Sequence, residues 1–120
     1  MTDEHAQEIA TAWLDAWNRH DLEAILEHYT EDVIFTSPFV EALLGNPSGT
    51  IQGKAALRDY FSQGLAAYPD LQFTKHQVLA GVDSLVIYYR SVKDLWTAEM
   101  MQIGPEGLVT RVMAHYRSEA

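Results

Sequence analysis

Residues 84–117, SLVIYYRSVKDLWTAEMMQIGPEGLVTRVMAHYR, form the stretch that decides the fold of this chain. Apolar residues recur there with a period close to two, which predicts strands. The runs of strand length are 84–92, 95–103 and 108–117. Only short turn sequences join them, Lys93-Asp94 and Gly104-Pro105-Glu106-Gly107. Because parallel strands need long crossover connections, turns this short predict an antiparallel meander.

Upstream of the meander, the hydrophobic period is that of a helix. A first helix is expected over 3–19, a short second one after Asp21, and a third between Gly53 and Pro69. The face of the first helix carries Ala6, Ile9, Ala10, Trp13 and Trp17. Helices followed by a strand meander indicate an α+β fold, in which the helices cover one face of a curved sheet.

Shorter elements fill the rest of the chain. Another strand, 71–80, is expected to precede the meander, and short strands are expected at 33–36 and 50–52. Residues 38–50 contain the glycine, asparagine, proline and serine that are typical of a loop, although 41–44 could form one helical turn.

Composition narrows the classes of function. The chain has 120 residues, 48% of them apolar, which suits one domain over 1–120 with a core of its own. It has no cysteine, so disulfides and Cys-ligated metals are excluded. A net charge of −9 argues against a nucleic-acid partner. No apolar run is long enough to span a bilayer and the first residues do not resemble a signal peptide, so a cytoplasmic protein without membrane contact is expected.

Three segments together resemble one known family. They are DLEAILEHYTEDVIFTSPF (Asp21–Phe39), IQGKAALRDYFSQGL (Ile51–Leu65) and GLVTRVMAHYRSE near the end of the chain. Their order and spacing are similar to the SnoaL-like and ketosteroid-isomerase-like branch of the nuclear-transport-factor-2-like superfamily, which includes polyketide-cyclase-like proteins. The resemblance implies a cone-shaped (cystatin-like) fold with a deep apolar pocket, no cofactor, and homodimers through the outer sheet surface.

The resemblance also assigns roles to individual positions. The catalytic carboxylate of ketosteroid isomerases corresponds to Ser37, which cannot replace it as a general base. Their oxyanion-binding tyrosine corresponds to Trp13, their second, protonated donor to Glu99, and a supporting tyrosine to Tyr29. Two of these four positions have changed, including the base, so the chain is not expected to be a true ketosteroid isomerase.

Glu99 is the residue that the sequence singles out. A two-residue turn at Lys93-Asp94 would place Tyr88 opposite Glu99 and Arg90 diagonally across from it. Glu99 is then either a pocket acid held by Tyr88 or Arg90, or part of a structural pair with Arg90 at the sheet surface. Pairing with Arg90 would keep Glu99 ionised, whereas burial without Arg90 would raise its pKa.

The predicted site therefore has two catalytic candidates, Glu99 and Tyr29. The residues expected to line the pocket are Trp13, Ser37, Tyr88, Arg90, Met101, Val112 and Tyr116. Trp17 and Phe61 are expected in the core. The five histidines include no pair at helical spacing, so no metal site and no cofactor are predicted.

Three functions remain open. The first is cofactor-free acid–base catalysis on a small hydrophobic molecule, of isomerase, cyclase or hydratase type, with Glu41 as a possible relocated base. The second is binding of such a ligand without catalysis, and the third is a structural dimer with a filled cavity. A homodimer is expected because one face of the last strands is strongly apolar. The residues assigned to that outer face are Trp96, Met100, Val109, Met113 and His115.

Overall fold

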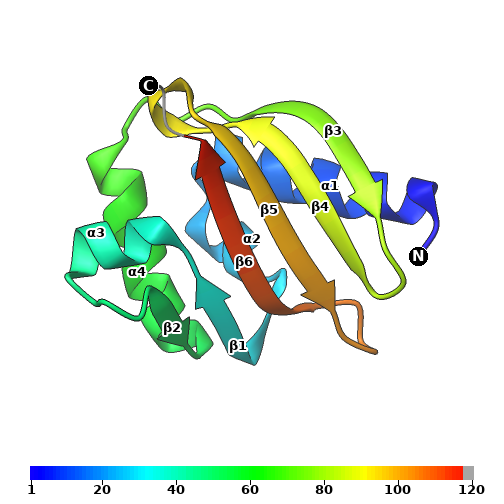
Figure 1. Ribbon diagram of the computed structural model, residues 1–120, viewed down its shortest axis with the longest axis horizontal. Coiled ribbons are helices and arrows are strands. Elements are labelled where there is room, and N and C mark those ends of the chain that lie inside the picture. Colours follow the sequence, from blue (N-terminus) through cyan, green and yellow to red (C-terminus); the bar gives the residue numbers. More distant parts are fainter. Residues whose placement is uncertain (118–120) are drawn as a thin grey trace.

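The computed structural model describes residues 1–117 of the chain, which form helices packed on one curved sheet (Figure 1). The elements in chain order are α1 (Asp3–Asn18), α2 (Leu22–Leu26), β1 (Tyr29–Thr36), α3 (Pro38–Leu44), β2 (Thr50–Gln52), α4 (Lys54–Ala67), β3 (Thr74–Ala80), β4 (Ser84–Arg90), the 3-10 turn η1 (Val92–Asp94), β5 (Trp96–Ile103) and β6 (Val109–Arg117).

The six strands form a single sheet in the order β2-β1-β6-β5-β4-β3. The pairs β3–β4, β4–β5 and β5–β6 are antiparallel, which confirms the predicted meander. Only β1 and β6 run parallel, so β1 and its antiparallel partner β2 extend the meander on one side. Figure 1 shows α1 behind β3, β4 and β5, while α4 lies toward the β1 and β2 side. The α+β fold predicted from the sequence is confirmed.

Side-chain caps explain where the helices begin. The Thr2 hydroxyl accepts a hydrogen bond from the His5 backbone N–H at 3.1 Å, and the Asp21 carboxylate accepts one from Ala24 at 3.1 Å. The inner face of α1 is buried as the periodicity predicted. Its apolar residues there are Ala6, Ala10, Trp13, Leu14, Ala16 and Trp17. These side chains pack against the concave face of the sheet and fix the position of α1.

Three expectations about element bounds were wrong. The strand expected at 33–36 is β1, which begins four residues earlier at Tyr29. Most of the N-terminal half of the expected loop 38–50 is the helix α3, because Ser37 caps it, Pro38 begins it, and Gly45 ends it with a left-handed φ of 66°. The strand expected from residue 71 begins only at Thr74. The Asn18 side chain in α1 accepts a hydrogen bond from the Phe73 N–H at 2.7 Å and donates one to the Phe73 carbonyl at 3.0 Å. Because both of its backbone groups are occupied, Phe73 cannot pair with a neighbouring strand.

The β4–β5 hairpin differs from the expected register by one residue. Lys93 and Asp94 form the predicted tight turn, each with φ 56°. However, Leu95 is opposed by two residues, since its N–H donates to the Val92 carbonyl at 3.2 Å and its carbonyl accepts from the Ser91 N–H at 2.8 Å. This bulge inserts one extra residue into the first strand of the hairpin. Glu99 therefore pairs with Ile87 and not with Tyr88.

A second irregularity lies between β5 and β6. The register shifts between Gln102 and Ile103, so that Ile103 pairs with Val109. The Val109 backbone N–H also donates to the His28 carbonyl at 2.7 Å, which draws this end of β6 toward α2. Val109 is buried in the core, and its expected place on the outer face was wrong.

Candidate functional site

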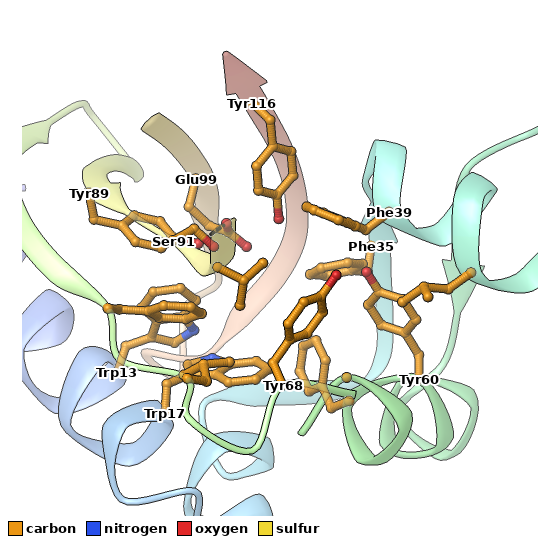
Figure 2. Close-up of a pocket in the computed structure, with 16 residues that line it drawn as sticks. Trp13, Trp17, Phe35, Phe39, Tyr60, Tyr68, Tyr89, Ser91, Glu99 and Tyr116 are labelled. Carbon is orange, nitrogen blue, oxygen red and sulfur yellow. Dashed lines mark hydrogen bonds between the residues drawn. The ribbon is translucent and has the colours of Figure 1, made fainter. Parts of the chain in front are cut away.

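A pocket lies on the concave face of the sheet, lined by α1, α3, α4, the segment before β3, and the strands β1, β4, β5 and β6 (Figure 2). It has a volume of about 70 Å³. Most of its walls are aromatic or aliphatic. The lining residues are Trp13, Trp17, Phe35, Phe39, Leu43, Tyr60, Phe61, Gly64, Tyr68, Leu71, Phe73, Tyr89, Ser91, Val92, Glu99 and Tyr116.

Glu99 is the only one of these lining residues with a carboxyl or a basic group. Its side chain projects from β5 and is only 3% exposed. Burial raises the pKa of the Glu99 carboxyl to about 7, and a hydrogen bond from Tyr89 acts in the opposite direction. Near neutral pH the carboxyl is therefore present in both protonation states.

Tyr89 holds this carboxyl in place. Its hydroxyl donates to Glu99 Oε1 at 2.9 Å, and both groups are buried. The Tyr89 ring is wedged against Trp13 and Phe73, with ring centroids 5.5 and 4.9 Å away. Such aromatic contacts restrict the ring, so the hydroxyl is a pre-positioned donor. Burial, followed by the charge of Glu99, raises the pKa of Tyr89 well above its usual range, and the phenol stays protonated.

Trp13 and Tyr29 form a second buried pair. The Trp13 indole Nε1–H donates to the Tyr29 hydroxyl at 2.9 Å. Trp13 lines the pocket as expected for that position, but this hydrogen bond already occupies its only donor. Tyr29 is fully buried and is not among the lining residues. It stands behind Trp13 and supports that wall of the site.

Ser37 and Tyr116 lie on the opposite side of the site from Trp13. The Ser37 hydroxyl accepts a hydrogen bond from the Phe39 N–H at 3.2 Å and caps α3, which is a structural task. Ser37 is buried but is not a lining residue. Tyr116 does line the pocket, and Figure 2 shows its hydroxyl directed into it from β6. Its ring meets Phe39 edge-on, with centroids 4.6 Å apart.

Tyr88 and Arg90 were wrongly assigned to the pocket. The bulge in the β4–β5 hairpin turns both to the outer face of the sheet. There Tyr88 stacks on Trp96 with centroids 4.9 Å apart, and the Arg90 guanidinium lies 4.1 Å from the Trp96 ring centroid. Arg90 pairs with Asp94 at 2.7 Å, so Glu99 has no cationic partner from that side.

For three other sets of residues, the structure differs from the expected location. Met101 and Val112 face inward as predicted, but they are fully packed core residues and do not line the pocket. Glu41 is exposed on α3 and lies outside the pocket, so it cannot act as a relocated base in this conformation. Trp17 and Phe61 are buried as expected for core residues, and they also line the pocket.

The sequence analysis missed two polar lining residues on β4 and its bulge, Tyr89 and Ser91. Regular alternation across a two-residue turn predicted that Tyr88 faces the pocket. The extra residue at 91–92 shifts β4 by one position, so Tyr89 faces the pocket and Tyr88 faces outward. Phe39 from α3, Tyr60 from the middle of α4 and Tyr68 at its C-terminal end were also missed. Nothing in their spacing separates a pocket wall from ordinary core.

Comparison with known proteins places the chain in a family. The SnoaL-like domain matches residues 10–120, and the protein belongs to this family. A SnoaL-like protein of unknown function from Burkholderia thailandensis is 40% identical, with a TM-score of 0.94 over 98% of this chain and 99% of that one. None of the curated proteins matches the chain in sequence.

More distant structures share the fold. The epoxide hydrolase/cyclase-like enzyme SalBIII, which has a role in pyran ring formation in the polyether salinomycin, is 21% identical, with a TM-score of 0.77 over 98% of this chain and 95% of that chain. An NTF2-like protein of unknown function from Cytophaga hutchinsonii is 11% identical, with a TM-score of 0.73 over 93% and 89% of the two chains. In the described part of the chain, no helix is both long and apolar enough to cross a membrane.

Proposed function

We propose that this protein binds a small, largely apolar molecule that carries an oxygen function, and that Glu99 transfers a proton to or from it without a cofactor. One observation carries the proposal. Glu99 is a buried carboxyl with a pKa of about 7, and it lines a pocket whose other walls bear no charge. Perturbed acids in clefts of this kind are typical of catalytic sites.

The arrangement of the carboxyl suits proton transfer. A group whose pKa lies near the working pH can both donate and accept a proton efficiently. Tyr89 holds Oε1, while Oε2 makes no hydrogen bond with a residue in 1–117 and is left for the ligand. Because the surroundings are apolar, a hydrogen bond to this oxygen is stronger than the same bond in water.

The pocket also limits what can enter it. An apolar protein cavity of about 150 Å³ holds a benzene molecule. The pocket here has about 70 Å³, so it accommodates only a few non-hydrogen atoms in this conformation. The reacting end of the ligand is therefore narrow, such as a carbonyl, an alcohol or a small oxygen ring.

A single carboxyl favours some reaction types over others. Ser37, at the position of the isomerase base, is occupied with capping α3, so steroid isomerisation is not proposed. Reactions that begin with protonation of an oxygen, such as the opening or closing of an oxygen ring, need only one positioned proton donor at first. The fold is shared with SalBIII, an epoxide hydrolase/cyclase-like enzyme, which is compatible with this class.

Two simple probes test the proposal. Hydrolysis of 1,2-epoxybutane and deuterium exchange of the α-protons of butanone are followed by proton NMR. The protein should accelerate at least one reaction, and Glu99→Gln should lower that acceleration by roughly 10²- to 10⁴-fold. Glu41→Gln is the matched control, since Glu41 is exposed, and it should leave the rate unchanged. An acceleration that survives Glu99→Gln would contradict the proposal.

Binding without catalysis is the second candidate, and one observation favours it. The lining residues include no second carboxylate or histidine that could act as the partner of Glu99. This alternative predicts that butanone perturbs the NMR signals of pocket residues while neither probe reacts faster than in buffer.

A further inference from the structure

We propose that the ligand site extends beyond the inner pocket into a hollow at its mouth, and that Ser91 forms a hydrogen bond with the ligand where the two meet. This inference rests on the proposed ligand site, but it does not depend on whether Glu99 is catalytic. It predicts an elongated, uncharged ligand with a second oxygen close to its reacting end.

The two spaces are adjoining. The outer hollow has a volume of about 380 Å³ and is lined by residues 67–72 and 91–93. Four of its lining residues, Tyr68, Leu71, Ser91 and Val92, also line the inner pocket. A molecule whose end reaches Glu99 would therefore pass these four side chains before its remainder reaches solvent.

Two of these four side chains, Tyr68 and Ser91, carry a hydroxyl, and Ser91 is the more buried of the two. Ser91 as a whole is 7% exposed, and its hydroxyl, which is not among the fully buried polar atoms, forms no hydrogen bond with any residue in 1–117. Ser91 and Glu99 both line the inner pocket (Figure 2). A hydroxyl that opens onto a pocket wall and makes no hydrogen bond with the protein is available to donate to a ligand oxygen.

The bulge that presents Ser91 is held from the outer face of the sheet. Lys93 and Asp94 adopt left-handed conformations that residues other than glycine rarely occupy. Arg90 fastens this turn by pairing with the Asp94 carboxylate at 2.7 Å and by donating to the Asp94 carbonyl at 3.1 Å. The structure thus maintains an unfavourable turn whose effect is to direct Ser91 and Val92 into the site.

The hollow also indicates the character of the ligand. It contains one acidic residue, Asp70, and one basic residue, Lys93, so it favours neither sign of charge. Leu71 and Val92 provide apolar surface near the junction. An uncharged chain with an ether, carbonyl or hydroxyl oxygen near Ser91 matches these groups.

A pair of isosteric ketones tests the inference. 2-Heptanone and 1-propoxypropan-2-one have the same chain length, but the second carries an ether oxygen two atoms from its carbonyl carbon. Their affinities are measured by NMR titration for the wild type, for Ser91→Ala, and for Ser84→Ala at the other end of β4 as the control. If the ether accepts a hydrogen bond from Ser91, Ser91→Ala should weaken the ether relative to 2-heptanone by about three- to tenfold.

Chain length tests the outer hollow separately. 2-Heptanone should bind at least about tenfold more tightly than butanone, because its extra methylene groups become buried outside the inner pocket. Equal affinities of these two ketones, no binding of either, or the same ether preference in wild type and Ser91→Ala would each overturn the inference. Loss of turnover in Glu99→Gln is a separate result, so failure of the catalytic proposal would be recognised independently.

Discussion

The two faces of the β4–β5 hairpin differ in how they surround charged groups. On the concave face, Tyr89 donates to Glu99, which has no cationic partner within residues 1–117 and whose pKa rises to about 7 because it is buried. On the convex face, Arg90 pairs with Asp94 and lies over Trp96, in partial contact with solvent. A charge that is paired and half-exposed serves to fasten a turn. A carboxyl that is buried without a counter-ion becomes an acid suited to neutral pH.

The largest difference between the faces should be in stability. Trp13→Ala on the concave side removes a fully buried ring and should cost about 3–5 kcal/mol of the free energy of unfolding. Trp96→Ala on the convex side should cost clearly less, since Trp96 is only half-buried. Urea unfolding of both variants measures this contrast at low protein concentration. Equal losses would show that the two faces are not distinguished by burial.

Glu99 should make the protein less stable as the pH rises. Its pKa is about 7 in the folded state against an ordinary glutamate value of 4.5, so below about pH 4.5 Glu99 is protonated in both the folded and unfolded states and costs no stability. Between these values the unfolded state releases its proton first, and stability falls until the pH passes about 7. The total loss should be about 3 kcal/mol.

Glu99→Gln provides the measurement. The variant should match the wild type near pH 4 and be more stable at pH 8, as followed by urea unfolding at each pH. All other carboxyl groups are common to both proteins, so the difference isolates Glu99. A variant less stable than the wild type at pH 8 would show that the folded state favours the ionised carboxyl.

The convex face should mediate a homodimer, which we propose from its composition. Val86, Met100 and Met113 lie side by side on adjacent strands, and all three are partly exposed. An apolar row of this kind, on the same face of the sheet as Trp96, is typical of an interface core. Met100→Lys should weaken association by at least about tenfold. Sedimentation at micromolar concentration measures this, and a wild type that is monomeric there would refute the proposed dimer.

The smallest effect is expected from the tyrosine hydroxyls. Tyr89→Phe removes the hydrogen bond that stabilises ionised Glu99, so Glu99 should become roughly tenfold weaker as an acid. Tyr88→Phe is the matched change on the other face and should leave the titration of Glu99 unaltered. A response to Tyr88→Phe comparable to that of Tyr89→Phe would contradict the observed register.

The fold was predictable because its signals are periodic and local. The alternation in 84–117 gave the antiparallel meander, and the spacing of Ala6, Ala10, Trp13 and Trp17 gave the buried face of α1. Glu99 could be located because β5 has no irregularity before Gln102. The identity of its partner could not be found, because one extra residue at Ser91–Val92 exchanges the faces of Tyr88 and Tyr89 without altering the hydrophobic pattern. Bulges depend on turn geometry that a single sequence specifies only weakly.

The most direct test of the account is the titration of the Glu99 carboxyl. Carbon-13 NMR of protein labelled at the glutamate carboxyl carbons, with Glu99→Gln used to assign the signal, follows ionisation of this one group. Burial with only Tyr89 as hydrogen-bond donor predicts a midpoint at a pH of about 7. A midpoint close to 4.5, the ordinary value for a glutamate, would mean that Glu99 is ionised throughout the neutral range. That result would contradict its assignment as the proton-transferring group of the pocket.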